Sequence, residues 1–213
     1  MHTTSNLIQL RILIIGLVVF YLPVNLLAQS GERISKEVDI AFGIVNFDLA
    51  ENETSLEGDN VDTEAATVTG SIPSLSFNYK LASTTTRAFY AKFVTPISSA
   101  DGNTILMGGV GLEFYIKSFS SKVNFDDGLS SIKIIPKYRF FWGVDLLLGS
   151  VAYTTDTDQS TDIFIEIAAQ GGFAYNFSET WGLKTNVSFG QGIGILTSST
   201  LVQFFVGASY FLD

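Results

Sequence analysis

The chain has 213 residues, of which 46% are hydrophobic and 15% are charged, whereas a typical soluble domain carries about 25% charged residues. The net charge is −9 and the few basic residues are scattered, which argues against a nucleic-acid-binding protein. The chain contains no Cys, which excludes a disulfide-stabilised scaffold and a lipoprotein.

Residues 1–28 have the pattern of a secretory signal peptide. Arg11 precedes a hydrophobic run that stops at the small residue Ala28. An N-terminal membrane anchor is the alternative, and Pro23 near the end of the run weighs against it. Cleavage after Ala28 would remove His2, the only histidine. We then expect residues 29–36 to form a short periplasmic segment ahead of a barrel domain at 37–213.

Alternation with a period of two dominates the chain after the signal peptide and predicts β-strands. In the first strand, Val38, Ile40 and Phe42 lie opposite Glu37 and Asp39. The alternation changes phase at residues 44–45, which predicts a β-bulge there. The eight predicted strands span residues 37–49, 70–81, 87–98, 104–118, 136–154, 162–177, 181–195 and 200–212.

The segment 119–135 leaves the strand count open. A strand within 119–127, and a break at Trp142–Gly143, would raise the total to ten. The unbroken alternation from Tyr138 to Leu148 favours eight strands.

The predicted connections are short turns that mostly alternate with longer acidic loops, which is typical of outer-membrane barrels. The longest is 50–69, and a second acidic stretch carries Asp156, Asp158 and Asp162. Carboxylates of this kind bind divalent cations in some proteins, but their spacing fits no calcium loop. We interpret both stretches as solvated external loops, and we expect no metal or other cofactor.

Three features favour a membrane barrel over a soluble one. The charge content is low, and the predicted strands are long enough to cross a bilayer when tilted. Aromatic residues also lie near strand ends, as in an interfacial girdle, at Tyr79, Phe177, Trp181 and Tyr210. The prediction is therefore an all-β protein, a transmembrane antiparallel up-and-down β-barrel. A secreted soluble barrel that binds an apolar ligand is the alternative.

The interior of an eight-stranded barrel is just wide enough to be filled by side chains. Buried charges persist only when they are paired, so we predict a salt-bridged lumen and no open pore. Gly190, Gly192 and Gly194 face inward and should leave room for Lys and Arg side chains. The predicted lumen charges are Asp39, Lys80, Lys92, Glu113, Lys117, Arg139, Asp145, Glu166 and Lys184.

Over residues 37–213 the chain resembles the small outer-membrane β-barrel proteins of Gram-negative bacteria, the OmpA/OmpX/OmpW-like group. The final strand carries the assembly signal of that group at Gly207, Tyr210 and Leu212. Phe205 departs from the pattern, because it stands where the group usually has a polar residue. The resemblance implies localisation in the outer membrane, contact with its lipids and lipopolysaccharide, and recognition by the barrel assembly machinery. We expect a monomer.

The predicted mature chain lacks the residues on which most barrel enzymes depend. General acid–base and triad chemistry usually need a histidine, and the only one lies in the signal peptide. Asp145 and Glu166 are therefore interpreted as lumen ion pairs, and the glycines at 108–111 and 190–194 as strand glycines. We predict a non-enzymatic barrel with a structural or loop-display role. Transport of small solutes or hydrophobic molecules is the alternative.

Overall fold

The computed structural model describes residues 35–51, 67–99, 102–116, 121–124, 131–154 and 159–212. The predicted signal peptide at 1–28, most of the acidic loop at 50–69, and Lys117 lie outside these residues. Among the residues described, none belongs to a helix that is long and apolar enough to cross a bilayer.

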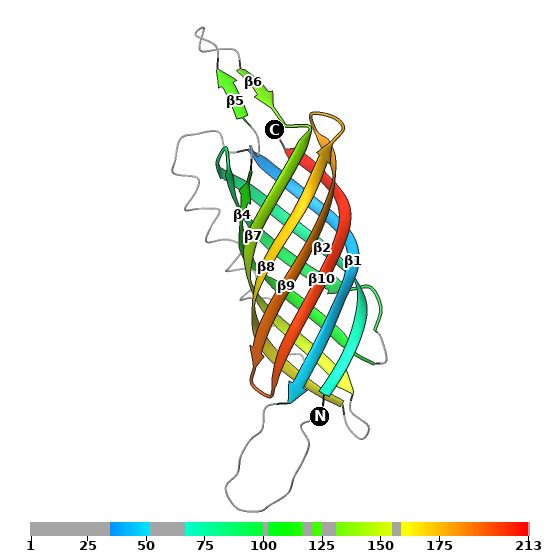
Figure 1. Ribbon diagram of the computed structural model, residues 1–213. Coiled ribbons are helices and arrows are strands. Elements are labelled where there is room, and N and C mark those ends of the chain that lie inside the picture. The colour runs from blue at the N-terminus through cyan, green and yellow to red at the C-terminus, as the bar shows by residue number, and fades with distance from the viewer. Residues whose placement is uncertain are drawn as a thin grey trace, which may run out of the picture.

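Eight antiparallel strands close into a single barrel, in the spatial order β1-β10-β9-β8-β7-β4-β3-β2 (Figure 1). The predicted eight-stranded up-and-down barrel is therefore confirmed. The closing pair is β1 with β10, as expected for a chain whose last strand removes the open edge of the sheet. The strands of the barrel are β1 (Lys36–Glu51), β2 (Thr67–Thr84), β3 (Arg87–Pro96), β4 (Thr104–Tyr115), β7 (Tyr138–Thr154), β8 (Gln159–Asn176), β9 (Trp181–Gly194) and β10 (Thr197–Leu212).

The segment whose strand content was open forms a separate hairpin. β5 (Ser121–Asn124) pairs with β6 (Ser131–Ile134) in a sheet of their own, outside the barrel. Figure 1 shows this hairpin projecting from the end of the barrel at which β10 finishes, which we call the terminal end. The short turns at 85–86 and 177–180 belong to the same end. The β4–β7 connection is an exception to the expected alternation of short turns and longer loops, because it carries this hairpin at the end that has the short turns.

The register of the strands sets the tilt of the barrel. A path of paired residues that starts at Ile40 passes once around the barrel and returns to β1 at Ala50, a shift of 50 − 40 = 10 residues. For eight strands this shift implies a tilt of about 40° from the barrel axis. At ~3.3 Å per residue, the 16 residues of β1 then rise ~40 Å along the axis, which exceeds the ~25 Å apolar band of outer-membrane barrels.

The outer surface becomes polar where β1 extends beyond that apolar band. Ile40, Phe42 and Ile44 are 50%, 57% and 42% exposed on the outside of the barrel. Beyond them Asn46 and Asp48 are the exposed residues. On the neighbouring strand β2, the corresponding outward residues are Thr67, Thr69 and Ser71.

The inner surface changes in the opposite sense at the same level. Val45, Phe47 and Leu49 point into the barrel and are at most 3% exposed. The register of β1 against both of its neighbours is unbroken from Lys36 to Ala50. The predicted bulge at residues 44–45 is therefore wrong. The strand is regular, and the apolar residues change face because the surroundings change from lipid to water.

Arginine substitutions on β1 should map this boundary. We expect Phe42→Arg to lower the free energy of unfolding by about 2–4 kcal/mol, because the charge would face lipid near the middle of the band. Asp48→Arg should change it by less than about 0.5 kcal/mol, because position 48 faces water. Urea titration of the barrel refolded in phospholipid vesicles measures both values. Equal effects at the two positions would contradict the boundary.

Candidate functional site

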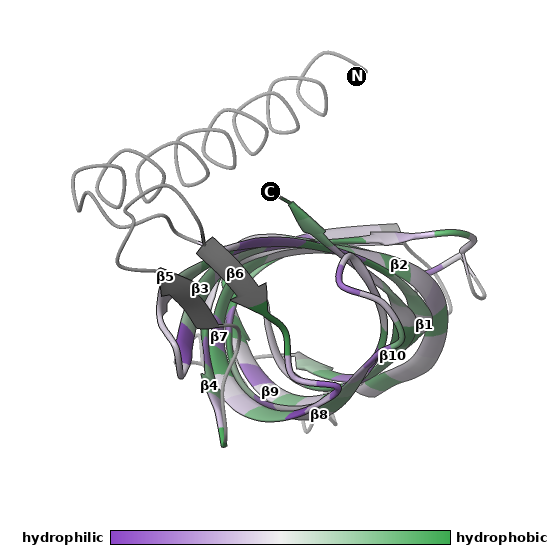
Figure 2. Cartoon of the chain, turned by 90° about the horizontal axis from the view of Figure 1, so that it is seen from above, coloured by the Kyte–Doolittle hydropathy of each residue, from purple (hydrophilic) through white to green (hydrophobic). Residues whose placement is uncertain are grey.

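The eight strands enclose a lumen, which Figure 2 views along the barrel axis. Of the predicted lumen charges, all except Lys117, which lies outside the described residues, are inward and at most 6% exposed. They are Asp39, Lys80, Lys92, Glu113, Arg139, Asp145, Glu166 and Lys184. The structure gathers them into two clusters and adds residues that the sequence did not mark.

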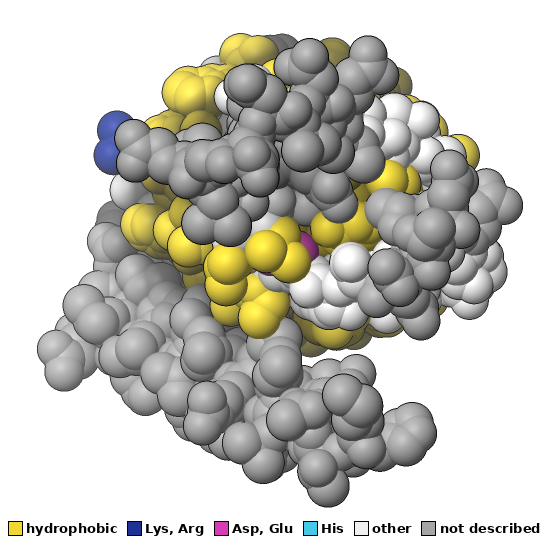
Figure 3. All heavy atoms as spheres, turned by 90° about the horizontal axis from the view of Figure 1, so that it is seen from below, with side chains coloured by type: hydrophobic (Ala, Val, Ile, Leu, Met, Phe, Trp, Pro, Cys, Tyr) yellow, Lys and Arg dark blue, Asp and Glu magenta, His cyan; other side chains and the backbone are white. Residues whose placement is uncertain are grey.

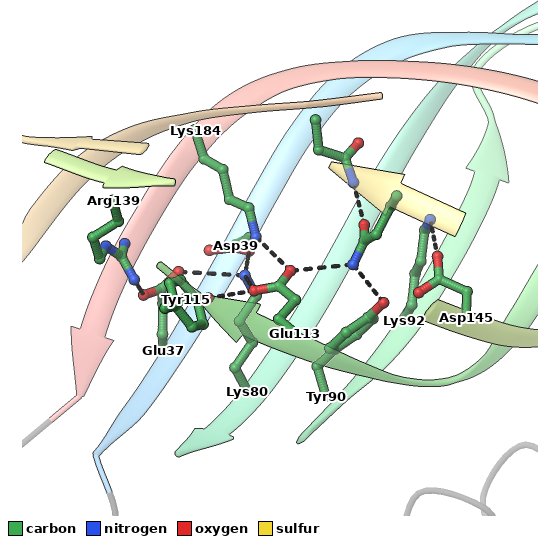
Figure 4. A network of polar contacts seen from close by, with 12 residues as sticks. Glu37, Asp39, Lys80, Tyr90, Lys92, Glu113, Tyr115, Arg139, Asp145 and Lys184 are labelled. Carbon is green, nitrogen blue, oxygen red and sulfur yellow. Dashed lines mark hydrogen bonds and ion pairs between the residues drawn. The ribbon is translucent and has the colours of Figure 1, made fainter. Parts of the chain in front are cut away.

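The larger group, which we call the terminal cluster, crosses the lumen near the terminal end (Figure 4). Lys80 Nζ lies 2.8 Å from Asp39 Oδ2 and 2.8 Å from Glu113 Oε2. Lys184 Nζ lies 2.8 Å from Glu113 Oε1 and 3.2 Å from Asp39 Oδ2. Two ammonium groups and two carboxylates thus alternate, and they come from β1, β2, β4 and β9. Each charge has two opposite partners, which offsets the cost of removing it from water.

Arg139 and Glu37 complete the terminal cluster. Arg139 Nη1 lies 2.6 Å from Glu37 Oε2, and its guanidinium lies 4.7 Å from the centre of the Phe211 ring. Tyr115 donates a hydrogen bond to Glu113. With these residues the cluster holds three cations and three carboxylates, so its charges balance. Glu37 was absent from the predicted set, although it has the same phase as Asp39 and that phase could have identified it.

The smaller group, the Lys92 cluster, lies farther from the terminal end. Lys92 Nζ is 2.9 Å from Asp145 Oδ2 and donates to Gln203 Oε1 at 3.1 Å. Gln203 Nε2 in turn donates to Glu166 Oε1 at 3.2 Å. Four strands, β3, β7, β8 and β10, supply the members. This cluster contains one cation and two carboxylates.

Neutral residues extend the terminal cluster beyond Glu113. Gln170 Nε2 donates to Tyr90 Oη at 2.6 Å and to Glu113 Oε1 at 3.3 Å, and Asn186 Nδ2 donates to Gln170 Oε1 at 2.5 Å. Gln170 and Asn186 carry no charge, so they are not among the predicted lumen charges. Their amides satisfy hydrogen bonds across the lumen that charged groups alone would leave unmade.

The distal half of the lumen, away from the terminal end, is filled mainly by apolar side chains, with the Asp162 carboxylate at its rim. The side chains of this distal core are at most 3% exposed. The predicted salt-bridged interior therefore describes only part of the lumen. Figure 3 views the barrel from this end and shows hydrophobic side chains among the residues around its mouth. The core consists of Val45, Phe47, Leu49, Ile72, Val94, Ile105, Met107, Leu147, Val151, Tyr153, Phe164, Leu201 and Phe205.

Phe205 stands at the junction of the distal core and the Lys92 cluster. It is 3% exposed, belongs to the core, and lies with its ring centre 6.0 Å from Lys92 Nζ. Its partner across the β1–β10 pair is Gly43, where any Cβ would collide with the Phe205 ring and the Phe204 carbonyl. The departure from the usual polar residue therefore has a physical reason, because position 205 points inward where the lumen becomes apolar.

The inward glycines of β9 do not make room for Lys or Arg, and that expectation was wrong. A Cβ at Gly190 would collide with the Glu166 carboxylate, and one at Gly194 with the Asp162 carboxylate. Asp162 accepts hydrogen bonds from the backbone N–H groups of Ile195, Leu196 and Thr197 at 3.2, 3.1 and 2.9 Å. It thus fixes the β9–β10 turn. Within the described residues, no three Asp, Glu, His or Cys side chains are arranged to hold a metal ion.

The residues of the predicted assembly signal are built into the closing strand. Gly207 pairs with Ala41, and a Cβ there would collide with the Ile40 carbonyl and with Ala41. Tyr210 faces outward and packs on Trp181 with ring centres 4.8 Å apart. Leu212 pairs with Lys36 at the terminal end of the barrel. Tyr210 and Trp181 are both exposed on the outer face near the terminal end, where an interfacial aromatic girdle would lie.

Comparison with solved structures places this fold among known barrels. Neisserial surface protein A has a TM-score of 0.53 at 10% identity, over 84% of this chain and 99% of that one. The N-terminal β-barrel domain of OprF from Pseudomonas aeruginosa has a TM-score of 0.52 at 10% identity, over 84% and 97%. Ail, the attachment invasion locus protein of Yersinia pestis, has a TM-score of 0.46 at 10% identity, over 83% and 98%.

No protein-family model matches the chain, and no curated protein matches it significantly. At such low identity the structural likeness shows the fold alone. The chain has the architecture of the small eight-stranded outer-membrane β-barrels, as its resemblance to that group predicted.

Removing one cation from the terminal cluster should strongly destabilise the barrel. We expect Lys80→Met to lower the free energy of unfolding by about 3–5 kcal/mol, because it leaves Asp39 and Glu113 with too little positive charge in a buried site. Lys36→Met is the matched control, since Lys36 is exposed on the same end of the barrel. Urea unfolding in vesicles compares the two. A loss of less than 1 kcal/mol, on the order of a surface substitution, for Lys80→Met would contradict the role assigned to the cluster.

Proposed function

We propose that the protein is an integral outer-membrane β-barrel without enzymatic activity, with a structural role in the envelope or a role in displaying its loops at the surface. The signal-peptide pattern at 1–28 supports export. The terminal residues Gly207, Tyr210 and Leu212 support recognition by the barrel assembly machinery. We further propose that the barrel is a monomer whose partners are the outer-membrane lipids and lipopolysaccharide.

The filled lumen is the observation that carries this proposal. The terminal cluster and the Lys92 cluster cross the terminal part of the lumen with hydrogen-bonded side chains. The distal core occupies the other part with close-packed apolar groups. A passage for water would have to breach two different barriers in series. An ion would lose its hydration in the apolar section without any compensating contact.

The arrangement of the carboxylates supports the absence of catalysis. Asp145 and Glu166 are 2% and 0% exposed, and the distal core separates them from the distal mouth. A substrate could not reach them without unpacking the barrel. The chain downstream of the proposed cleavage site also contains no His and no Cys to act as a nucleophile or general base.

An apolar ridge on β9 and the β9–β10 turn favours the second candidate function, transport of hydrophobic molecules along the barrel wall. Ile193 and Ile195 are 76% and 78% exposed, and Leu196 is 49% exposed. They continue the apolar outer surface toward the distal end, beyond the level at which β1 becomes polar. A barrel that transfers apolar molecules into the membrane would present such a surface. The extent of the exposed belt also argues against the third candidate, a secreted soluble barrel.

Conductance in planar bilayers tests the filled lumen. We expect no single-channel current from the wild-type barrel, and none from Phe164→Ala, because the charged clusters still block the lumen. A variant that combines Phe164→Ala with Lys80→Ala, Glu113→Ala and Lys92→Ala removes groups from all three layers of the lumen and should admit ions, and heat-dependent gel mobility verifies that it is folded.

Three outcomes separate the candidates. Current steps in the wild type would overturn the filled lumen. Uptake of an apolar dye by proteoliposomes, lost in Ile193→Ser/Ile195→Ser, would favour the transport function. Release of the protein from membranes by carbonate would favour the soluble barrel.

A further inference from the structure

The charges of the lumen do not balance, and the imbalance lies in the Lys92 cluster. The terminal cluster holds three cations and three carboxylates, whereas the Lys92 cluster holds Lys92 against Asp145 and Glu166. These three side chains are 1%, 2% and 0% exposed. A buried net charge of this kind is costly because the surrounding side chains stabilise it far less than bulk water would.

The strand register brings the two carboxylates of the Lys92 cluster together. Asp145 pairs with Ala168 and Leu147 pairs with Glu166, so the acids are diagonal neighbours on the inner face of β7 and β8. Diagonal neighbours have Cα atoms roughly 7–8 Å apart, within reach of each other's charge.

The hydrogen bonds of the cluster do not satisfy both carboxylates as anions. Asp145 Oδ2 accepts a hydrogen bond from the Lys92 ammonium group at 2.9 Å, while Asp145 Oδ1 has no hydrogen-bond partner among the described residues. The two oxygens of Glu166 accept hydrogen bonds from a neutral group, the Gln203 amide, whose Nε2 lies 3.2 and 3.4 Å away. The Ser188 hydroxyl, 1% exposed on β9, is also without a partner in the part of the chain that is described.

The groups around the cluster do not supply the missing positive charge. On β2, β4 and β9, Lys80, Glu113 and Lys184 are bound to one another in the terminal cluster. On β3, the Tyr90 hydroxyl is engaged by Gln170 of β8. On the distal side, β1, β7 and β10 contribute apolar members of the distal core, which end at Leu147 and Phe205. The Asp162 carboxylate of β8 also lies on that side, and it is bound by backbone N–H groups of the β9–β10 turn.

We propose that Asp145 and Glu166 together hold one proton at neutral pH, which makes the Lys92 cluster electrically neutral. Two carboxylates that share a desolvated site do not both ionise readily, because each raises the cost of the other's charge. A proton fits better than a metal ion, because the Lys92 ammonium already occupies the position next to Asp145 and would repel a second cation. The site is thus a proton-binding site inside the barrel, and it does not depend on where the protein resides.

Infrared spectroscopy of the folded barrel in vesicles tests this site. In deuterated buffer at neutral pH, the wild type should show the carbonyl band of a protonated carboxyl group, with an intensity of about one group per chain. Glu166→Gln and Asp145→Asn should each abolish the band, since the remaining carboxylate then pairs with Lys92. Lys92→Met should increase it roughly twofold, because both acids must then be neutral. Glu179→Gln, in the exposed turn at 177–180, is the matched control and should leave the band unchanged.

Each possible result decides the question. No band in the wild type, or a band that survives both Glu166→Gln and Asp145→Asn, would overturn the proposal. A band that appears only after sodium, potassium and calcium are removed would also overturn it, because a metal ion would then hold the place of the proton. Gel mobility verifies that each variant is folded, and a conducting wild-type barrel would contradict the filled lumen without affecting the band.

Discussion

The structure depends on one constraint, which is that the strands separate two surroundings whose polarity reverses along the barrel axis, as β1 shows most clearly. Within the lipid band the outer face must be apolar, and the lumen is the only place for the polar side chains that alternate with it. Beyond the band the outer face meets water, and apolar side chains are then shielded from water only in the lumen. β1 shows both regimes in one regular strand, with Asp39 inside and Phe42 outside, then Phe47 inside and Asp48 outside.

This reversal explains why the interior contains two kinds of packing. Polar side chains directed into a lumen too narrow for bulk water must pair with one another, and the terminal cluster does so with each lysine between two carboxylates. The distal core needs no such pairing and is packed like the interior of a soluble protein. Phe205 lies between the two and contacts both, with Gly43 providing the space for its ring.

Much of the fold was predictable from the sequence, because alternation over long strands specifies which residues share a face. The strand count, the closing pair and the inward charges follow from that pattern. The position at which a strand leaves the lipid does not follow from the pattern, because the change of phase between Ile44 and Val45 is equally compatible with a β-bulge. Nor does the pattern reveal that Lys80 meets Glu113 while Lys92 meets Asp145. Those pairs depend on the shift of the sheet around the barrel, which no single strand encodes. The turn-fixing role of Asp162 was hidden for the same reason, because its partners lie on the next hairpin.

Spin labels placed along the outer face of β1 test the central claim most directly. With the barrel in vesicles, labels at positions 40, 42, 44, 46 and 48 report whether oxygen in the lipid or a water-soluble nickel complex relaxes them more strongly. The reversal of polarity predicts that oxygen dominates at 40, 42 and 44 and that the nickel complex dominates at 46 and 48. Oxygen dominance at all five positions would place the whole strand in lipid and contradict the account.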